Sequence, residues 1–333
     1  MPHKNFVPPP QALDRNLALE VVRVTEASAL AAAQWMGRGD EKAADDAATT
    51  AMRDALNSLA MDGVILNGEA DDAAQPLHTG EKVGNGKGPR VDITLTAIEG
   101  VTICAKASHN ALSVVAATDS GSFLHVPHNV YMEKIAVGGG LPAGIVDLDL
   151  QPEENLARVA NAKGMSITDL TVCMLDRPRH SELLGRIYDA GARVVLIDDG
   201  DVSGAIATGL PETGIDIYMG SGGAAEGVLA AAGLKCLGGQ MQCRLMLRSE
   251  DERQRARRAG IDDLIRKWDV DDMVRGDVMF AATGITDGHI LKGVRHHPGG
   301  AVSHSMVMRS MTGTIRQLTA RHDFIKHAKL HSS

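Results

Sequence analysis

Hydrophobic residues near the start of the chain recur at intervals typical of helices. Four of them predict one apolar helix face: Leu17, Val21, Val24 and Trp35. Asp14 is expected to cap this helix, and Gly37 and Gly39 are expected to end it. A second helix is predicted over residues 47–59, with an apolar face made by Met52, Ala55, Leu56 and Leu59.

Three segments between residues 63 and 126 have strand patterns. The short apolar run "GVIL" (63–66) predicts a buried strand. In "VDITLT" (91–96) apolar and polar residues alternate, which predicts a half-buried strand that carries residue 96 to its C-terminal end. The segment "LSVVAATDSGSFLHV" (112–126) predicts a hairpin that turns at Asp119, Ser120 and Gly121.

From residue 152 onward, helix and strand patterns alternate with glycines between them. The expected elements are a helix at 153–163, strands at 171–175 and 193–197, a helix at 181–190, a short helix after "DDGD", and a strand at 216–219. The stretch "GSGGAAEG" (220–227) is expected to be a loop leading into a helix. This alternation is typical of a parallel sheet covered by helices. We expect a leader over residues 1–12 and two domains, 13–165 and 166–330.

The composition narrows the fold class and the partners. Hydrophobic residues make up 44% of the 333 residues and aromatic residues only 3%, so the cores must consist mainly of aliphatic side chains and Met. Such cores suit helices packed on strands better than an aromatic-rich β-sandwich. The net charge of −8 and the lack of a Lys and Arg stripe disfavour nucleic-acid binding, and the charged segment 248–260 predicts a solvated helix.

The cysteines and the N-terminal segment indicate the cellular compartment in which the protein is expected. Cys104, Cys173, Cys236 and Cys243 form no CxxC pair, which favours reduced thiols over a zinc site or disulfides. The segment "MPHKNFVPPP" lacks an apolar signal region, and no apolar run approaches the roughly 18 residues of a membrane span. We therefore expect a cytoplasmic protein that does not bind membranes.

Four acidic residues lie at the ends of predicted elements. They are Asp45, Glu69, Glu99 and Glu226. Magnesium and manganese prefer oxygen ligands, and carboxylates from several loops commonly hold them. Each residue alone is more often a solvated surface group or a helix cap, and Glu226 near a helix start also suits the helix dipole.

Three further stretches are compatible with phosphate or sugar binding. The N–H groups of "GSGGAAEG" can face an anion at a helix start, although the stretch does not match the GxGxxG pattern of dinucleotide sites. "RPRH" (177–180) offers two guanidiniums for phosphate, or simply begins a surface helix. "DDGD" (198–201) can bind sugar hydroxyls, or form a turn with a helix cap.

Eight segments follow one another in a specific order: "VRVTEASALAAAQWMGRGDEKAAD", "GEKVGNGKGPRVDI", "IEG", "YMEKI", "RPRH", "DGDV", "GIDIYMGSGGAAEGV" and "FAATGITDG". In this order the chain resembles the class II fructose-1,6-bisphosphatases over roughly residues 13–323. The resemblance implies a mixed α/β (α+β) fold, a layered α/β/α/β/α sandwich of two domains. It also implies manganese- or magnesium-dependent hydrolysis of the 1-phosphate of fructose 1,6-bisphosphate, with sedoheptulose 1,7-bisphosphate as a second substrate in some members.

The resemblance also implies the site residues. Metal ligands fall on Asp45, Glu69, Glu99 and Glu226, and the first three are the expected catalytic residues. The first domain is expected to carry most metal ligands, and the second to carry Glu226 and the substrate loops. Substrate contacts fall on Glu99, Gly100, Val101, Tyr131, Arg177, Pro178, Arg179, Asp199, Gly200, Asp201 and Gly223. A homodimer or homotetramer is implied as well.

The chain departs from the family pattern around the metal loops. Thr96 stands where the family has a metal-binding Asp, and Val101 stands where it has a Thr. Ala97 and Ala225 replace prolines, the loop after Glu69 is one residue short, and "VPHNVYMEK" (126–134) lacks an Asp and is one residue longer. A neutral hydroxyl is a poor ligand for a dication, so two hypotheses remain. The chain is either a phosphatase, or an impaired member that retains sugar-phosphate binding, regulation or oligomerisation.

Overall fold

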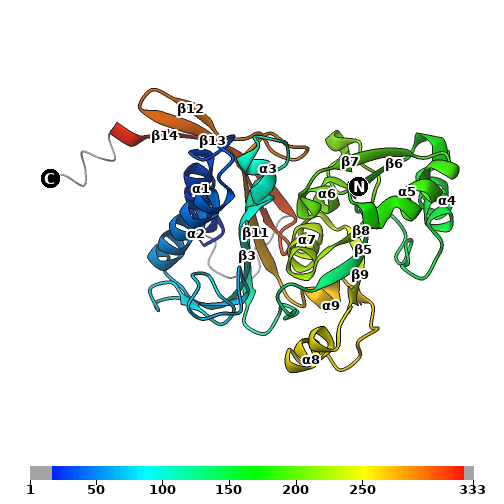
Figure 1. Ribbon diagram of the computed structural model, residues 1–333, viewed down its shortest axis with the longest axis horizontal. Coiled ribbons are helices and arrows are strands. Elements are labelled where there is room, and N and C mark those ends of the chain that lie inside the picture. Colours follow the sequence, from blue (N-terminus) through cyan, green and yellow to red (C-terminus); the bar gives the residue numbers. More distant parts are fainter. Residues whose placement is uncertain (1–16, 326–333) are drawn as a thin grey trace, which may run out of the picture.

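The computed structural model describes residues 17–325, which form two β-sheets with helices around and between them (Figure 1). The helices are α1 (Leu17–Ala33), α2 (Glu41–Ser58), α3 (Val101–Ala105), α4 (Pro152–Lys163), α5 (Ser181–Asp189), α6 (Asp201–Ala207), α7 (Ala224–Leu237), α8 (Glu250–Arg258) and α9 (Val270–Met273). Helices α1 and α2 cover the outer face of the first sheet, α6 and α7 lie between the sheets, and α4 and α5 cover the second sheet. The layers therefore follow the predicted α/β/α/β/α order.

The first sheet has eight strands, which come from both ends of the described chain. They are β1 (Asp62–Asn67), β2 (Lys82–Val83), β3 (Arg90–Glu99), β4 (Leu112–Asp119), β11 (Val278–Gly284), β12 (Arg295–His297), β13 (Gly300–Arg309) and β14 (Thr314–Asp323). Their order is β12-β13-β11-β4-β3-β1-β2, with β14 paired to β13. Strands β1 and β3 are parallel, so Glu69 just after β1 and Thr96 near the end of β3 approach the same edge.

The second sheet has six strands in the order β10-β9-β5-β8-β6-β7. They are β5 (Tyr131–Val137), β6 (Thr171–Leu175), β7 (Arg193–Ile197), β8 (Ile217–Gly223), β9 (Gln240–Met246) and β10 (Trp268–Asp269). The prediction of a parallel sheet is correct for β6, β7 and β8, whereas β5 runs antiparallel to β8 and β9. Local patterns predict β6, β7 and β8, but they do not reveal that β5 lies beside β8 or that β9 pairs with β5.

The sheets are interleaved along the chain. The boundary predicted near residue 165 does not coincide with the change of sheet, because β5 precedes it and already belongs to the second sheet, on which the preceding helix α4 packs. Strands β11 to β14 follow it and return to the first sheet. No helix within residues 17–325 is long and apolar enough to cross a membrane.

Several predicted elements agree closely with the structure. Strands β6 and β7 have the predicted bounds, and α4 and α5 differ from theirs by one residue at one end. Gly164 ends α4 in the left-handed conformation. Helix α2 begins six residues before the predicted start, because Asp40 accepts a hydrogen bond from the Ala43 N–H and caps it there. The predicted cap Asp14 lies outside the described residues.

Three expectations about strands are wrong. No hairpin follows β4, because β3 and β11 already occupy its two edges, and Phe123 instead bridges to Val274. Strand β3 is not half-buried but covered on both faces, since α1 and α2 pack on one face and the layer between the sheets covers the other. The glycines up to Gly223 form the end of β8 rather than a loop.

Candidate active site

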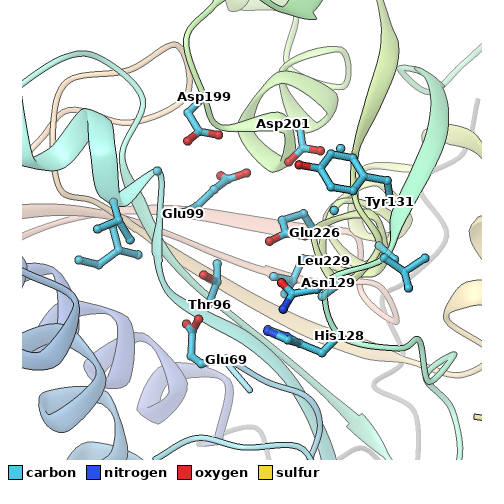
Figure 2. A pocket seen from close by; sticks show the side chains of 18 of the residues that line it. Glu69, Thr96, Glu99, His128, Asn129, Tyr131, Asp199, Asp201, Glu226 and Leu229 are labelled. Carbon is cyan, nitrogen blue, oxygen red and sulfur yellow. The ribbon is translucent and has the colours of Figure 1, made fainter. Parts of the chain in front are cut away.

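A cavity of about 420 Å³ lies between the sheets, where β3 and β8 end and where α6 and α7 begin (Figure 2). Two sets of side chains line it. The first, here called the carboxylate cluster, consists of Glu69, Glu99 and Glu226. The second, here called the arginine cluster, consists of Tyr131, Arg177 and Arg179. The fold thus brings residues from distant parts of the sequence into one cavity.

Glu69 lies just beyond β1 and is held by the end of β3. Its Oε1 accepts a hydrogen bond of 2.5 Å from the Ala97 N–H. Burial, reinforced by the negative charges of Asp45 and Glu226, raises the pKa of Glu69 to about 7. The hydrogen bonds from Ala97 and from the Thr96 side chain offset part of that rise. The Glu69 carboxylate therefore lacks a positive partner in this environment.

Glu99 ends β3 and faces the start of α6. Its Oε1 accepts a hydrogen bond of 2.6 Å from the Val202 N–H, while its buried Oε2 has no hydrogen-bond partner among the described residues. Burial, together with the charge of Asp201, raises the pKa of Glu99 well above its usual range. Gly100 follows with φ of 86°, a conformation that favours glycine and turns the chain away into α3.

Glu226 lies in the first turn of α7, close to a buried ion pair. Lys134 Nζ donates to the Asp201 carboxylate, and both side chains are almost fully buried. Burial lowers the pKa of Lys134, but the charges of Asp201 and Glu226 outweigh it and raise that pKa overall. Burial and the Asp201 charge raise the pKa of Glu226, which Lys134 partly offsets. One buried cation thus faces several acidic groups.

Glycines at the end of β8 make room for these acids. A Cβ on Gly222 would lie 2.0 Å from an Asp201 oxygen, and one on Gly223 would lie 1.9 Å from a Glu226 oxygen. Any larger residue at either position would displace a carboxylate. The glycine stretch therefore fits the acidic side chains directly, which explains its composition better than a flexible loop does.

The donor chemistry fits a divalent cation. The orphaned Glu99 Oε2 and the raised pKa values of the carboxylate cluster show negative charge that protein groups do not neutralise. Asp45, on α2, is near enough to raise the pKa of Glu69, although it does not line the cavity. Among residues 17–325, however, no three His, Cys, Asp or Glu side chains are gathered closely enough to hold a metal ion.

The two substituted positions lie at the carboxylate cluster. Thr96 is 7% exposed, lines the cavity and hydrogen-bonds Glu69, so a neutral hydroxyl occupies the place of the expected Asp. Val101 begins α3 and lines the cavity together with Thr102. Figure 2 shows Thr96 and Glu69 close together in the view, with Glu99 and Glu226 facing the same space.

The arginine cluster is supported by an extensive set of hydrogen bonds. Arg179 donates from Nε to Ser221 Oγ at 3.0 Å and from Nη2 to the Ser221 carbonyl at 2.5 Å. The buried His180 bonds through Nδ1 to the Leu175 carbonyl at 2.9 Å, and its Nε2 accepts the Ser221 N–H at 2.9 Å. Burial lowers the pKa of His180, which keeps Nε2 available as an acceptor. Ser221 therefore connects His180 to Arg179.

Not every expected contact residue reaches the cavity. Gly100, Val101, Asp199, Asp201 and Gly223 line it, whereas Pro178 and Gly200 do not. Pro178 begins the short 3₁₀ turn that carries Arg179. Gly200, with φ of 92°, allows the chain to enter α6. These two residues position their neighbours.

Sequence reasoning missed several residues of the site. His128 and Asn129 line the cavity from the loop before β5, and Figure 2 shows them below Glu226 and Leu229. Lys134 and Ser221 support the site from within β5 and β8. A signal existed for Lys134, because a lysine inside a buried strand needs a charged partner. No comparable signal marked Ser221.

Comparisons with known proteins identify the family of the chain. The family model described as bacterial fructose-1,6-bisphosphatase, glpX-encoded, matches residues 15–322. The chain is 43% identical over 327 residues to a protein of Haemophilus influenzae (strain Rd) named fructose-1,6-bisphosphatase class 2, covering 93% of this chain and 97% of the relative. It is 39% identical over 336 residues to a protein of Synechococcus sp. (strain JA-3-3Ab) named D-fructose 1,6-bisphosphatase class 2/sedoheptulose 1,7-bisphosphatase, covering 93% and 96%. The chain therefore belongs to the class II fructose-1,6-bisphosphatase family.

Proposed function

We propose that this chain hydrolyses the 1-phosphate of fructose 1,6-bisphosphate in a reaction that depends on a divalent metal. The observation that carries the proposal is one cavity lined by both a carboxylate cluster and an arginine cluster. The first suits a cation and a phosphoryl group under attack, and the second suits a phosphate that is only bound. A sugar bisphosphate has one phosphate for each cluster.

Class II fructose-1,6-bisphosphatases depend on divalent metals, and we propose manganese as the preferred ion with magnesium as its substitute. Glu69, Glu99 and Glu226 are the proposed ligands, with Asp45 beside Glu69. When bound, the metal would neutralise phosphoryl oxygens and make a bound water more acidic. The unpartnered Oε2 of Glu99 supports this assignment, because a buried carboxylate oxygen needs a donor or a cation.

The protein's own groups would orient the substrate. Arg177 and Arg179 would hold the phosphate that stays on the sugar, and Tyr131 would pack beside it. Asp199 and Asp201, at the start of α6, would accept hydrogen bonds from sugar hydroxyls, with Lys134 holding Asp201 in place. Glu69 and Glu99 would accept hydrogen bonds from the attacking water and orient it, with Asp45 acting on Glu69 through its charge.

The seven-carbon substrate sedoheptulose 1,7-bisphosphate is a second candidate. The Synechococcus relative carries both activities in its name, whereas the Haemophilus relative carries only the fructose activity. We therefore propose fructose 1,6-bisphosphate as the principal substrate. The alternative of an impaired member that only binds sugar phosphates has no support from these comparisons, despite Thr96 and Val101.

Location and assembly extend the proposal. The four cysteines are buried free thiols, which supports a reducing compartment, the cytoplasm. A homodimer or homotetramer is proposed because closed symmetric assemblies are common among soluble oligomers. Light scattering at micromolar concentration tests it, and a monomer alone would contradict it.

The test of the activity is release of inorganic phosphate by the purified full chain. Fructose 1,6-bisphosphate, sedoheptulose 1,7-bisphosphate and fructose 6-phosphate should be compared with manganese, magnesium and a chelator. We expect release from fructose 1,6-bisphosphate with manganese, little from fructose 6-phosphate, and none with chelator. If neither bisphosphate released phosphate in a metal-dependent way, the proposal would be overturned.

A further inference from the structure

Two guanidinium groups lie over the ring of Tyr131, although only that of Arg179 lines the cavity. The Cζ atom of Arg179 is 5.1 Å from the ring centroid, and that of Arg248 is 4.4 Å from it. Arg179 is bonded to Ser221 of β8, while Arg248 follows the end of β9. Since β5 carries Tyr131 and lies between β8 and β9, a cation approaches the ring from each neighbouring strand.

Within residues 17–325, neither guanidinium forms an ion pair with a carboxylate. The charge of Arg179 acts on the nearby Asp199, and the exposed side chain of Arg248 contacts the Tyr131 ring. By contrast, Arg244 on the adjoining strand is paired with both Glu133 and Asp149. Two unpaired cations at one ring repel each other in a chain with an excess of acidic residues. An anion that both guanidiniums contact would remove that repulsion.

The backbone of Arg248 is fixed even though its side chain is exposed. Its N–H donates to the carboxylate of Glu252, which also accepts the Ser249 N–H. Ser249 Oγ in turn accepts the Glu252 N–H, so a capping box fixes the start of α8. The guanidinium therefore projects from an anchored position beside the arginine cluster.

We propose that Arg248 binds, together with Arg179, the phosphate of the sugar bisphosphate that is not hydrolysed, and that it thereby selects bisphosphates over sugar monophosphates that carry only the attacked phosphate. This inference rests on the proposed function. Arg248 would contribute to binding that phosphate rather than to the attacked one, because its guanidinium contacts the Tyr131 ring and does not line the cavity beside the carboxylate cluster. Its loss should weaken substrate affinity and leave the chemical step nearly unchanged.

The test compares two competitive inhibitors that differ in which phosphate they carry. Fructose 6-phosphate has the phosphate proposed to meet Arg248, and fructose 1-phosphate lacks it. In Arg248→Gln, the inhibition constant of fructose 6-phosphate and the KM for fructose 1,6-bisphosphate should rise by about tenfold or more. The inhibition constant of fructose 1-phosphate and kcat should stay within about twofold of wild type.

Two further variants separate binding from packing. Arg248→Lys keeps the charge and should retain most of the affinity for fructose 6-phosphate, whereas Gln keeps a planar group over the ring but no charge. Arg253→Gln, on the exposed face of α8, is the matched control and should behave as wild type. Equal losses for both inhibitors, or equal behaviour of the Lys and Gln variants, would overturn the inference. If the wild type released no phosphate, the proposed function would fail instead, and calorimetric binding of both sugar phosphates would still decide the role of Arg248.

Discussion

The carboxylate cluster and the arginine cluster share a cavity but are stabilised differently. Arg179 is held by two hydrogen bonds to Ser221, which His180 positions in turn. Glu69 and Glu99 each accept one backbone N–H, yet their pKa values stay raised and Glu99 Oε2 lacks a partner. Arg179 is therefore anchored by hydrogen bonds within the protein, whereas the carboxylate cluster keeps negative charge that no protein group neutralises. Thr96 and Val101 line the cavity near the carboxylate cluster. The departures from the family pattern therefore affect the cluster whose charge the protein does not neutralise.

The largest expected effect comes from the orphaned carboxylate. Glu99→Gln removes the charge while keeping the oxygen that accepts the Val202 N–H. Because outer-shell changes at metal sites already cost about 10–100-fold, loss of a direct ligand should lower kcat/KM at least about a hundredfold. Phosphate-release kinetics and manganese calorimetry measure this. Fructose 6-phosphate should still bind, and a variant that lost its affinity as well would show that the two clusters are not independent.

The second effect is a dependence of stability on pH in metal-free protein. The pKa of Glu69 is raised to about 7 from 4.5, so the folded state binds more protons than the unfolded state between these values. The free energy of unfolding should therefore fall as pH rises from about 4.5 to about 7, by about 3 kcal/mol from this residue, and level off above. Urea unfolding at several pH values checks it. Glu69→Gln should flatten the curve, and an unchanged slope in that variant would assign the titration to another group.

A smaller effect on substrate affinity is expected from changing His180, which positions Arg179 through Ser221. His180→Leu leaves the buried Ser221 N–H without its acceptor and loosens the anchor of Arg179. KM for fructose 1,6-bisphosphate should rise about tenfold while kcat changes little. His180→Gln can place an amide oxygen near the Nε2 position and should recover part of the affinity. If kcat fell while KM stayed constant, His180 would act on the chemical step rather than through Arg179.

The elements that sequence reasoning located well are those whose signals are local. Strands β6 and β7 are short apolar runs bounded by turns, and Gly164 marks a helix end, so no distant residue is needed to identify them. The prediction that β3 is half-buried was wrong, because its polar face is covered by the helices between the sheets. These helices come from residues more than a hundred positions later in the chain. The alternating pattern showed which residues share a face, but it could not show what packs on that face.

The site residues also divide into those with local sequence signals and those that depend on distant residues. The resemblance named every Asp, Glu and Arg residue that lines the cavity, because their motifs are continuous in sequence. Lys134, Ser221 and Arg248 were missed because each acts through a partner on another strand or loop. Asp45 and Glu69 lie 24 positions apart in the sequence and interact electrostatically, yet the side chains are not gathered into a metal site. The spacing of acidic residues in the sequence does not determine whether their side chains come close enough to bind one metal ion.

We infer that the carboxylate cluster lacks one acidic ligand at residue 96, and a manganese titration measures the effect of that loss. Thr96→Asp restores the charge beside Glu69, whereas the similarly sized Thr96→Asn does not. Electron paramagnetic resonance of free manganese, titrated into purified wild type and both variants, gives the three dissociation constants. We expect binding at least about tenfold tighter in Thr96→Asp, with faster phosphate release, and little change in Thr96→Asn. Equal manganese affinity in wild type and Thr96→Asp would contradict it and would mean that the ligand set is already complete without residue 96.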